Sequence, residues 1–181
     1  PVSLTYYYKR KEDLAAAVLF DTIHRWEDML VQAEAGVTPA ERLTRFLAAY
    51  FEERRRIALG EGLRLTPFSE IGLIEGEQQA SLITAFNSLY VRIGRLMKSD
   101  ATPWVTAPRR QVLARMLVSF LGWTDSWLDS YAPEDYPRVA ARVSEIMIES
   151  PPLPAAGKGA LSPEDWLWTV IADRLRRATS P

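Results

Sequence analysis

The sequence opens with Pro1-Val2-Ser3-Leu4-Thr5-Tyr6-Tyr7-Tyr8-Lys9-Arg10-Lys11-Glu12-Asp13-Leu14, and the rest of the chain is organised around this stretch. Three tyrosines in a row run directly into three basic residues. Two acids follow, and an alanine-rich amphipathic pattern begins at Leu14. Carboxylates suit the first turn of a helix because the amino-terminal end of a helix carries partial positive charge. The stretch therefore predicts the end of a short helix joined to the start of a long one.

Beyond Leu14 the sequence is typical of an all-α fold. Apolar residues recur at spacings of three and four, and no strand-like alternation occurs. Thr38, Pro39 and Glu41 form a capping-box pattern with proline at the first helical position, which predicts a helix start. The predicted helices cover residues 12–35, 39–59, 77–97, 108–131 and 134–150, and one further short helix is expected inside the irregular stretch 60–76.

The end of the chain has a different composition. Residues 151–161 are rich in proline and glycine and predict a linker, and residues 162–181 predict a carboxy-terminal helical extension whose helix covers 162–178. Residues 12–150 would then form one helical body, which is large enough to bury a single core.

Composition narrows the classes of function. The chain has 181 residues, 48% of them hydrophobic and 25% charged, which is ordinary for a globular protein. The chain has no cysteine, which excludes thiolate chemistry and cysteine-based zinc sites. Its single histidine nearly excludes histidine metal clusters and Ser-His-Asp triads. We therefore predict no enzyme, no cofactor and no metal site. The sequence shows neither a membrane-spanning apolar run nor a signal-peptide pattern, so we expect a cytoplasmic protein without membrane contact.

The run from Leu4 to Leu14 resembles the end of the helix-turn-helix in tetracycline-repressor (TetR) family transcription regulators. There the usual run is Leu-Tyr-Tyr-His-Phe, two variable residues, and then Lys-Glu-Glu-Leu. The resemblance implies a TetR-like helical bundle in which residues 1–14 end the helix-turn-helix and start the connecting helix. Residues 12–150 would be the ligand-binding and dimerisation domain. It also implies that the chain as given begins inside the helix-turn-helix, after its first two helices.

The resemblance assigns DNA contacts to the opening stretch. In helix-turn-helix proteins the second helix lies in the major groove, while hydroxyls, cations and backbone amides bind phosphates. Ser3, Thr5 and Tyr6 would face the groove, and Tyr7 and Lys11 would contact the phosphate backbone. Thr5 stands where the family most often has tyrosine. The alternative is that the tyrosines and charges only close a junction between two helices.

The helix expected over residues 108–131 is apolar on more than one side, which requires burial on more than one side. TetR-family proteins dimerise through their last two large helices, so the resemblance implies a homodimer. The alternative is the central helix of a monomeric bundle. The predicted dimer contacts are Met116, Phe120, Trp127, Val143 and Met147.

TetR-family proteins bind an effector between the helices of the body, and here the resemblance implies a small hydrophobic effector. An apolar cavity with a few polar anchors suits such a ligand. The alternative is that the same aromatics are ordinary core. The predicted pocket residues are Tyr50, Arg54, Phe68, Phe86, Asn87, Tyr90 and Trp123, with residues 60–76 as the expected gate.

These expectations together predict a ligand-responsive, DNA-binding transcriptional regulator. It would be a homodimeric repressor that binds operator DNA and is released from it by the effector. The alternative is a helical scaffold or partner-binding module with no DNA role.

Overall fold

The structure is a computed structural model that describes residues 10–100 and 105–148. This part of the chain contains helices and no strand, so the predicted all-α class is confirmed. The chain divides into two compact units, residues 1–144 and 145–181, and the described residues 145–148 of the second are the last turn of a helix. The predicted DNA contacts Ser3, Thr5, Tyr6 and Tyr7, the linker 151–161 and the helix 162–178 lie outside the described residues.

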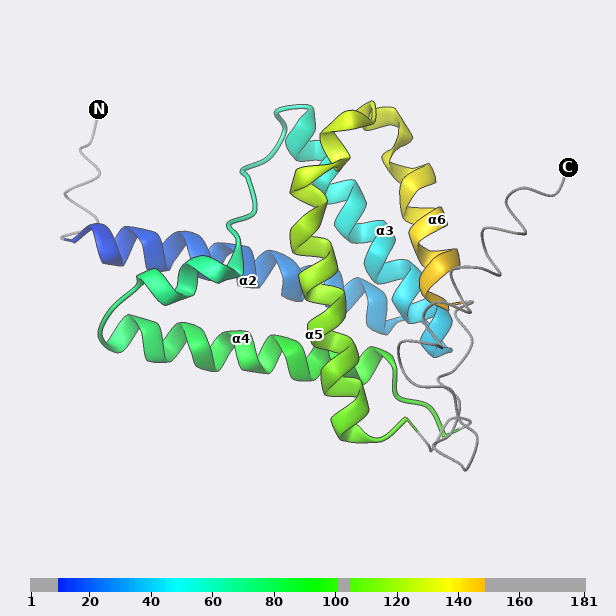
Figure 1. The fold of residues 1–181 in the computed structure, drawn as a ribbon, viewed down its shortest axis with the longest axis horizontal. Coiled ribbons are helices and arrows are strands. Elements are labelled where there is room, and N and C mark those ends of the chain that lie inside the picture. Colours follow the sequence, from blue (N-terminus) through cyan, green and yellow to red (C-terminus); the bar gives the residue numbers. More distant parts are fainter. Residues whose placement is uncertain (1–9, 101–104, 149–181) are drawn as a thin grey trace, which may run out of the picture. The chain divides into compact units, whose positions relative to one another are not determined.

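Two long helices begin the described part. Helix α2, Lys11–Glu34, starts with Glu12 and Asp13 in its first turn. Helix α3, Pro39–Ala58, starts with the predicted capping box, since Glu41 N donates to Thr38 Oγ1 at 3.1 Å and the Glu41 carboxylate accepts from Thr38 N. Its last turn carries two arginines, which suit the negative end of the helix dipole. Figure 1 shows that α2 crosses behind α5 and runs beside α4.

The turn between α2 and α3 is held by one arginine. A Cβ at Gly36 would lie 2.7 Å from Arg42 N, so this close approach requires glycine. Arg42 Nη1 donates to Gly36 O and Val37 O, while its Nε donates to Leu96 O at 2.9 Å and its Nη2 to Lys98 O at 2.6 Å. The guanidinium therefore binds carbonyls of the turn that follows α2 and carbonyls at and just after the end of the helix that finishes at Leu96.

That helix is α4, Glu77–Leu96, and it follows the irregular stretch that the sequence predicted. A short 3₁₀ helix, η1, covers Phe68–Leu73. Gly76, with φ of +79°, lets the backbone turn directly into α4. Ile71 and Ile74 from this stretch pack with Leu19 of α2 in a buried cluster. The sequence-based boundaries of α2, α3 and α4 are confirmed to within one or two residues.

Helix α5, Ala107–Trp123, is shorter than predicted. The expected helix 108–131 ends at Trp123 and continues as the 3₁₀ turns η2, Thr124–Ser126, and η3, Leu128–Ser130. Three donors meet at the Leu121 carbonyl, which would be the α-helical acceptor of the Asp125 amide: the Thr124 backbone N–H, in a 3₁₀-type bond, and the hydroxyls of Thr124 and Tyr50.

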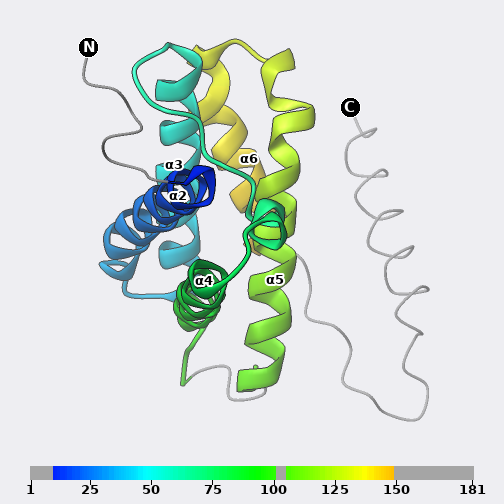
Figure 2. The same cartoon turned by 90° about the vertical axis from the view of Figure 1, so that its left-hand side faces the viewer.

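Another helix follows within the described residues. The 3₁₀ turn η4, Pro133–Asp135, leads into α6, Tyr136–Ile148, where the sequence predicted a helix over 134–150. Figure 2 shows α2 lying between α3 and α4, with α5 along one side of them. The largest fully buried side chains come from α2, α3, α4, α5 and the start of α6, and they include Ile23, Leu30, Phe46, Phe51, Leu89, Ile93, Leu117, Leu121 and Tyr136. One core therefore joins the helices of residues 10–144.

Candidate functional site

Four of the predicted pocket residues belong to a continuous row of aromatic rings, which we call the aromatic row. Tyr50 of α3 contacts Trp26 of α2 at a centroid distance of 5.5 Å, and Trp26 contacts Phe68 of η1 at 5.3 Å. Phe68 in turn lies 4.5 Å from Phe86 of α4, which lies 4.5 Å from Tyr90. Trp26, which is not among the predicted pocket residues, is the ring that joins Tyr50 to Phe68.

One end of the aromatic row is polar. The Tyr50 hydroxyl donates to Leu121 O at 2.7 Å and lies 2.9 Å from Thr124 Oγ1. Burial raises the pKa of Tyr50 above its ordinary value of 10.0, against the opposing effects of the Thr124 hydrogen bond and the Arg54 charge. Arg54, only 9% exposed, forms an ion pair with Asp125, and its Nε is buried without a hydrogen-bond partner among the described residues. An unpaired buried donor is costly, so this end has unused hydrogen-bonding capacity.

The other end of the row carries a cation. The guanidinium carbon of Arg115 on α5 lies 4.9 Å from the centre of the Tyr90 ring, a cation–π contact. Burial raises the pKa of the Tyr90 hydroxyl, and the Arg115 charge opposes that shift. The two remaining predicted pocket residues face solvent in the single chain: Asn87 is exposed, and Trp123 is 66% exposed. The structure thus gathers Tyr50, Arg54, Phe68, Phe86 and Tyr90 around one row, and Asn87 and Trp123 are not gathered there.

A second feature is an exposed apolar stripe along α5, formed by Val112, Met116, Phe120 and Trp123. Met116 is 62% exposed and Phe120 is half-buried. Large exposed apolar areas on a protein surface commonly mark interaction sites. The other predicted dimer residues differ in exposure: Trp127 and Met147 are half-buried, whereas Val143 is 8% exposed and has little area left to offer a partner.

Lys11 is the one predicted DNA contact within the described residues. It is the first residue of α2, and its side chain is 92% exposed. Lys11 forms an ion pair with Glu12, whose carboxylate lies 3.9 Å from the ammonium. The ammonium is therefore accessible to an anion.

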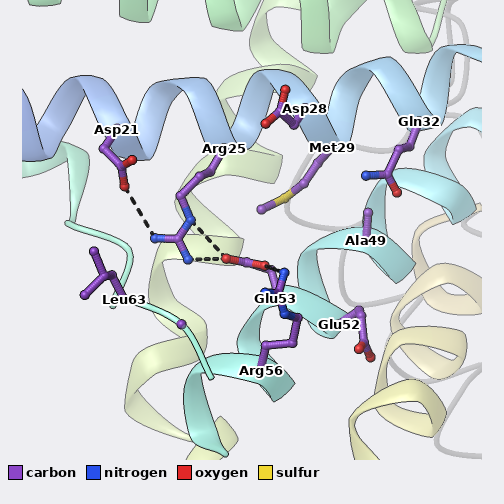
Figure 3. A pocket seen from close by; sticks show the side chains of 11 residues that line it. Asp21, Arg25, Asp28, Met29, Gln32, Ala49, Glu52, Glu53, Arg56 and Leu63 are labelled. Atoms are coloured by element: carbon purple, nitrogen blue, oxygen red, sulfur yellow. Dashed lines mark hydrogen bonds and ion pairs between the residues drawn. The ribbon is translucent and has the colours of Figure 1, made fainter. Parts of the chain in front are cut away.

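A groove of about 450 Å³ lies between α2, α3 and the loop at residues 62–63. Figure 3 shows Arg25 reaching from α2 to Glu53 of α3 at its centre. Arg25 Nε donates to Glu53 Oε1 at 2.9 Å, and both side chains are largely buried. Arg56 contacts the other carboxylate oxygen of Glu53 at 3.4 Å. No local pattern predicts this groove, because Arg25 and Glu53, which meet at its centre, are 28 residues apart in the chain.

Two further kinds of feature, a metal site and a membrane-spanning helix, find no support in the part of the chain that the structure describes. Over residues 10–100 and 105–148, no three or more Asp, Glu or His side chains are grouped so as to hold a metal ion. None of the helices in these ranges combines the length and apolar character needed to cross a membrane. No protein-family model, curated protein or solved structure matches the chain.

Proposed function

We propose that this protein is a ligand-responsive, DNA-binding transcriptional regulator of the TetR type, a repressor that a small hydrophobic effector releases from its operator. The resemblance of the run from Leu4 to Leu14 supports the DNA-reading role. The single observation that carries the proposal is the continuity of α2, whose 24 residues begin at Lys11, within that run. A helix of this length spans about 36 Å, enough to link a DNA-reading end to the interior of the body.

The aromatic row supplies the coupling in this proposal. Its rings come from α2, α3, η1 and α4, so a ligand inserted between them must displace Trp26 and with it α2. The apolar rings bind the body of the effector, and the unpaired Nε of Arg54 offers one polar anchor. A ligand can shift α2 only by its difference in affinity for the two positions of the helix.

The apolar stripe supports the homodimer in this proposal. Two copies packed through Met116 and Phe120 would cover side chains that a monomer leaves in water. A two-fold dimer also carries two reading ends, which suits a near-palindromic operator with half-sites in successive turns of DNA.

Electrophoretic mobility shift with the product of the complete gene, on the DNA upstream of that gene, tests the proposal. We expect sequence-selective binding that weakens as salt rises, because phosphate contacts release counterions. Small lipophilic compounds that raise the melting temperature should then release the DNA, since a ligand of the native state stabilises that state. Absence of selective, salt-sensitive binding would contradict the proposal.

The same stripe also fits a second function, a helical scaffold that binds a different protein through α5. In that case the product of the complete gene would be a monomer that does not retard operator DNA. Sedimentation equilibrium and the mobility-shift assay, performed on one preparation, distinguish the two functions.

A further inference from the structure

Four charged side chains make consecutive contacts at the centre of the groove between α2 and α3, and we call them the charge network (Figure 3). Arg25 of α2 binds Glu53 of α3 through Nε, at 2.9 Å, and through Nη2. Asp21, one turn before Arg25 on α2, has a carboxylate oxygen 3.7 Å from Arg25 Nη1. Arg56, on α3, contacts the second carboxylate oxygen of Glu53 at 3.4 Å. Only the central contact of the network joins the two helices.

The inner and outer members of the charge network differ in exposure. The side chains of Arg25 and Glu53 are largely buried, whereas those of Asp21 and Arg56 are more than half exposed. A largely buried ion is costly when it loses its partner. Here each inner ion has a second possible partner on its own helix and near solvent. If α2 moves away from α3, Asp21 therefore travels with Arg25, and Arg56 stays with Glu53.

Arg25 also has an unused donor in the observed arrangement. Its Nη1 is buried and has no hydrogen-bond partner among residues 10–100 and 105–148. The Asp21 oxygen at 3.7 Å lies beyond hydrogen-bond distance, and a movement of less than about 1 Å would bring it within reach. An unpaired buried donor raises the free energy of the arrangement that contains it. The bond to Glu53 is thus made at a cost that pairing with Asp21 would remove.

The charge network lies next to the aromatic row in the chain. Trp26, the residue after Arg25, is the ring that joins Tyr50 to Phe68. Because the two neighbours share one turn of α2, a ligand that displaces Trp26 also draws Arg25 away from Glu53. An exchange of partners within the charge network would lower the cost of that displacement.

We propose that Arg25 exchanges partners in a two-position switch between α2 and α3. In the closed position Arg25 binds Glu53 and holds the two helices together. In the open position Arg25 pairs with Asp21 and Glu53 pairs with Arg56, so each charge keeps a partner while the helices separate. The inference rests on the proposed function for its trigger, the effector that displaces Trp26. The two positions themselves can be measured without DNA or effector.

Double electron–electron resonance on the full chain measures the separation of the helices. The chain contains no cysteine, so spin labels can be placed uniquely at Val18→Cys in α2 and Ala48→Cys in α3, two exposed positions. In Glu53→Gln the population with a longer distance should rise at least about fivefold, because a charge-assisted contact between the helices is lost. Glu52→Gln is the matched control, since it removes an equal charge from a carboxylate that Arg55 binds within α3. Equal distance distributions in the two variants overturn the proposal.

A second substitution separates the switch from an ordinary ion pair. Asp21→Asn, added to Glu53→Gln, removes the partner of Arg25 in the open position. The longer-distance population should then fall about twofold, the effect expected of one exposed ion pair within a helix. Asp28→Asn, an equal charge change at an exposed acid further along α2, should leave that population unchanged. No greater fall with Asp21→Asn than with Asp28→Asn overturns the switch.

Glutamine keeps the shape of Glu53 and can still accept a hydrogen bond, so we expect the fold to be retained, which circular dichroism checks. Asp21→Asn alone tests the switch even if Glu53→Gln unfolds. It should slow the exchange of the Arg25 Nε proton with water about twofold, measured by nuclear magnetic resonance, because the bond to Glu53 then opens less often. Unchanged or faster exchange contradicts the switch. Failure of operator binding would contradict the proposed function and leave these results standing.

Discussion

The hydroxyl oxygens of Tyr50 in α3 and Thr124 at the end of α5 lie 2.9 Å apart, and both donate to the carbonyl oxygen of Leu121. All three residues are buried. The contact ends α5 and ties its carboxy-terminal end to the middle of α3. It therefore fixes the position of α5 relative to the aromatic row that Tyr50 begins.

Tyr50→Phe should lower the free energy of unfolding by about 1 kcal/mol, because a buried hydrogen bond is lost while the ring is kept. Urea denaturation followed by circular dichroism measures the change. Tyr131→Phe is the matched control, since that ring is 45% exposed, and it should leave stability nearly unchanged. Equal stability of the two variants would contradict a structural role for the Tyr50 hydroxyl.

The same hydroxyl should make stability fall at alkaline pH. Burial raises the pKa of Tyr50 in the folded protein, whereas the unfolded chain loses this proton near 10.0. Above that pH the folded state binds more protons than the unfolded state, so the free energy of unfolding decreases until the folded pKa is passed. Denaturation at pH of about 9 and about 11 should show a smaller decrease in Tyr50→Phe than in the unaltered protein. An identical decrease in both proteins would show that Tyr50 does not contribute.

Asp125→Asn should destabilise the fold by about 1–3 kcal/mol, because Arg54 is then buried without its charged partner. The effect stays below that of a fully buried pair because the Asp125 side chain is 45% exposed. Thermal denaturation measures it. Asp129→Asn provides an exposed comparison nearby in the chain and should change the melting temperature little. A double variant that replaces Arg54 with methionine as well should recover part of the loss.

Arg42→Ala should destabilise the fold by about 2 kcal/mol or more, since four backbone carbonyls lose a charged donor at once. Arg45→Ala, one turn later on α3, removes an exposed arginine and is the control. Hydrogen exchange offers the sharper measurement. Amides near the ends of α2 and α4 should exchange faster in Arg42→Ala than in Arg45→Ala, and uniform exchange in both would argue against a local clamp.

Met116→Glu should abolish dimerisation if two copies pack through the apolar stripe. Each protomer loses an apolar contact and would bury a glutamate charge at the interface. Because the interface is two-fold symmetric, both unfavourable changes occur twice in the dimer. The dimer dissociation constant should therefore rise at least about 100-fold. Analytical ultracentrifugation measures the oligomeric state. Val31→Glu, at a valine that is 60% exposed on α2, is the matched control and should leave the oligomeric state unchanged. A protein that is monomeric before any substitution would contradict the dimer.

Most helix positions could be predicted because their signals are local. The capping box of Thr38 and Glu41 starts α3 where expected, and the break at Gly76 precedes α4 as expected. The end of α5 could not be predicted in the same way. Its apolar spacing continues past Trp123, but the hydroxyl of Tyr50, 71 residues earlier in the chain, binds the Leu121 carbonyl there.

In the candidate site, too, local sequence predicts some features and the packing of the helices determines the others. Helical spacing indicates that Tyr50, Phe86 and Tyr90 lie on apolar faces, but it does not indicate that Trp26 joins them through Phe68. Nor does it predict which aromatics remain exposed, as Trp123 does. These outcomes depend on how the helices cross, which no single stretch of sequence encodes.

The helical class and nearly all helix boundaries follow from local sequence, since apolar periodicity, caps and glycines act within a few residues of one another. Which polar groups meet depends instead on how the helices pack. The pairs Arg25–Glu53 and Arg54–Asp125 and the clamp of Arg42 on Leu96 join residues from separate helices. A partly buried charge must find a partner, and the packing of the helices determines which partner lies within reach.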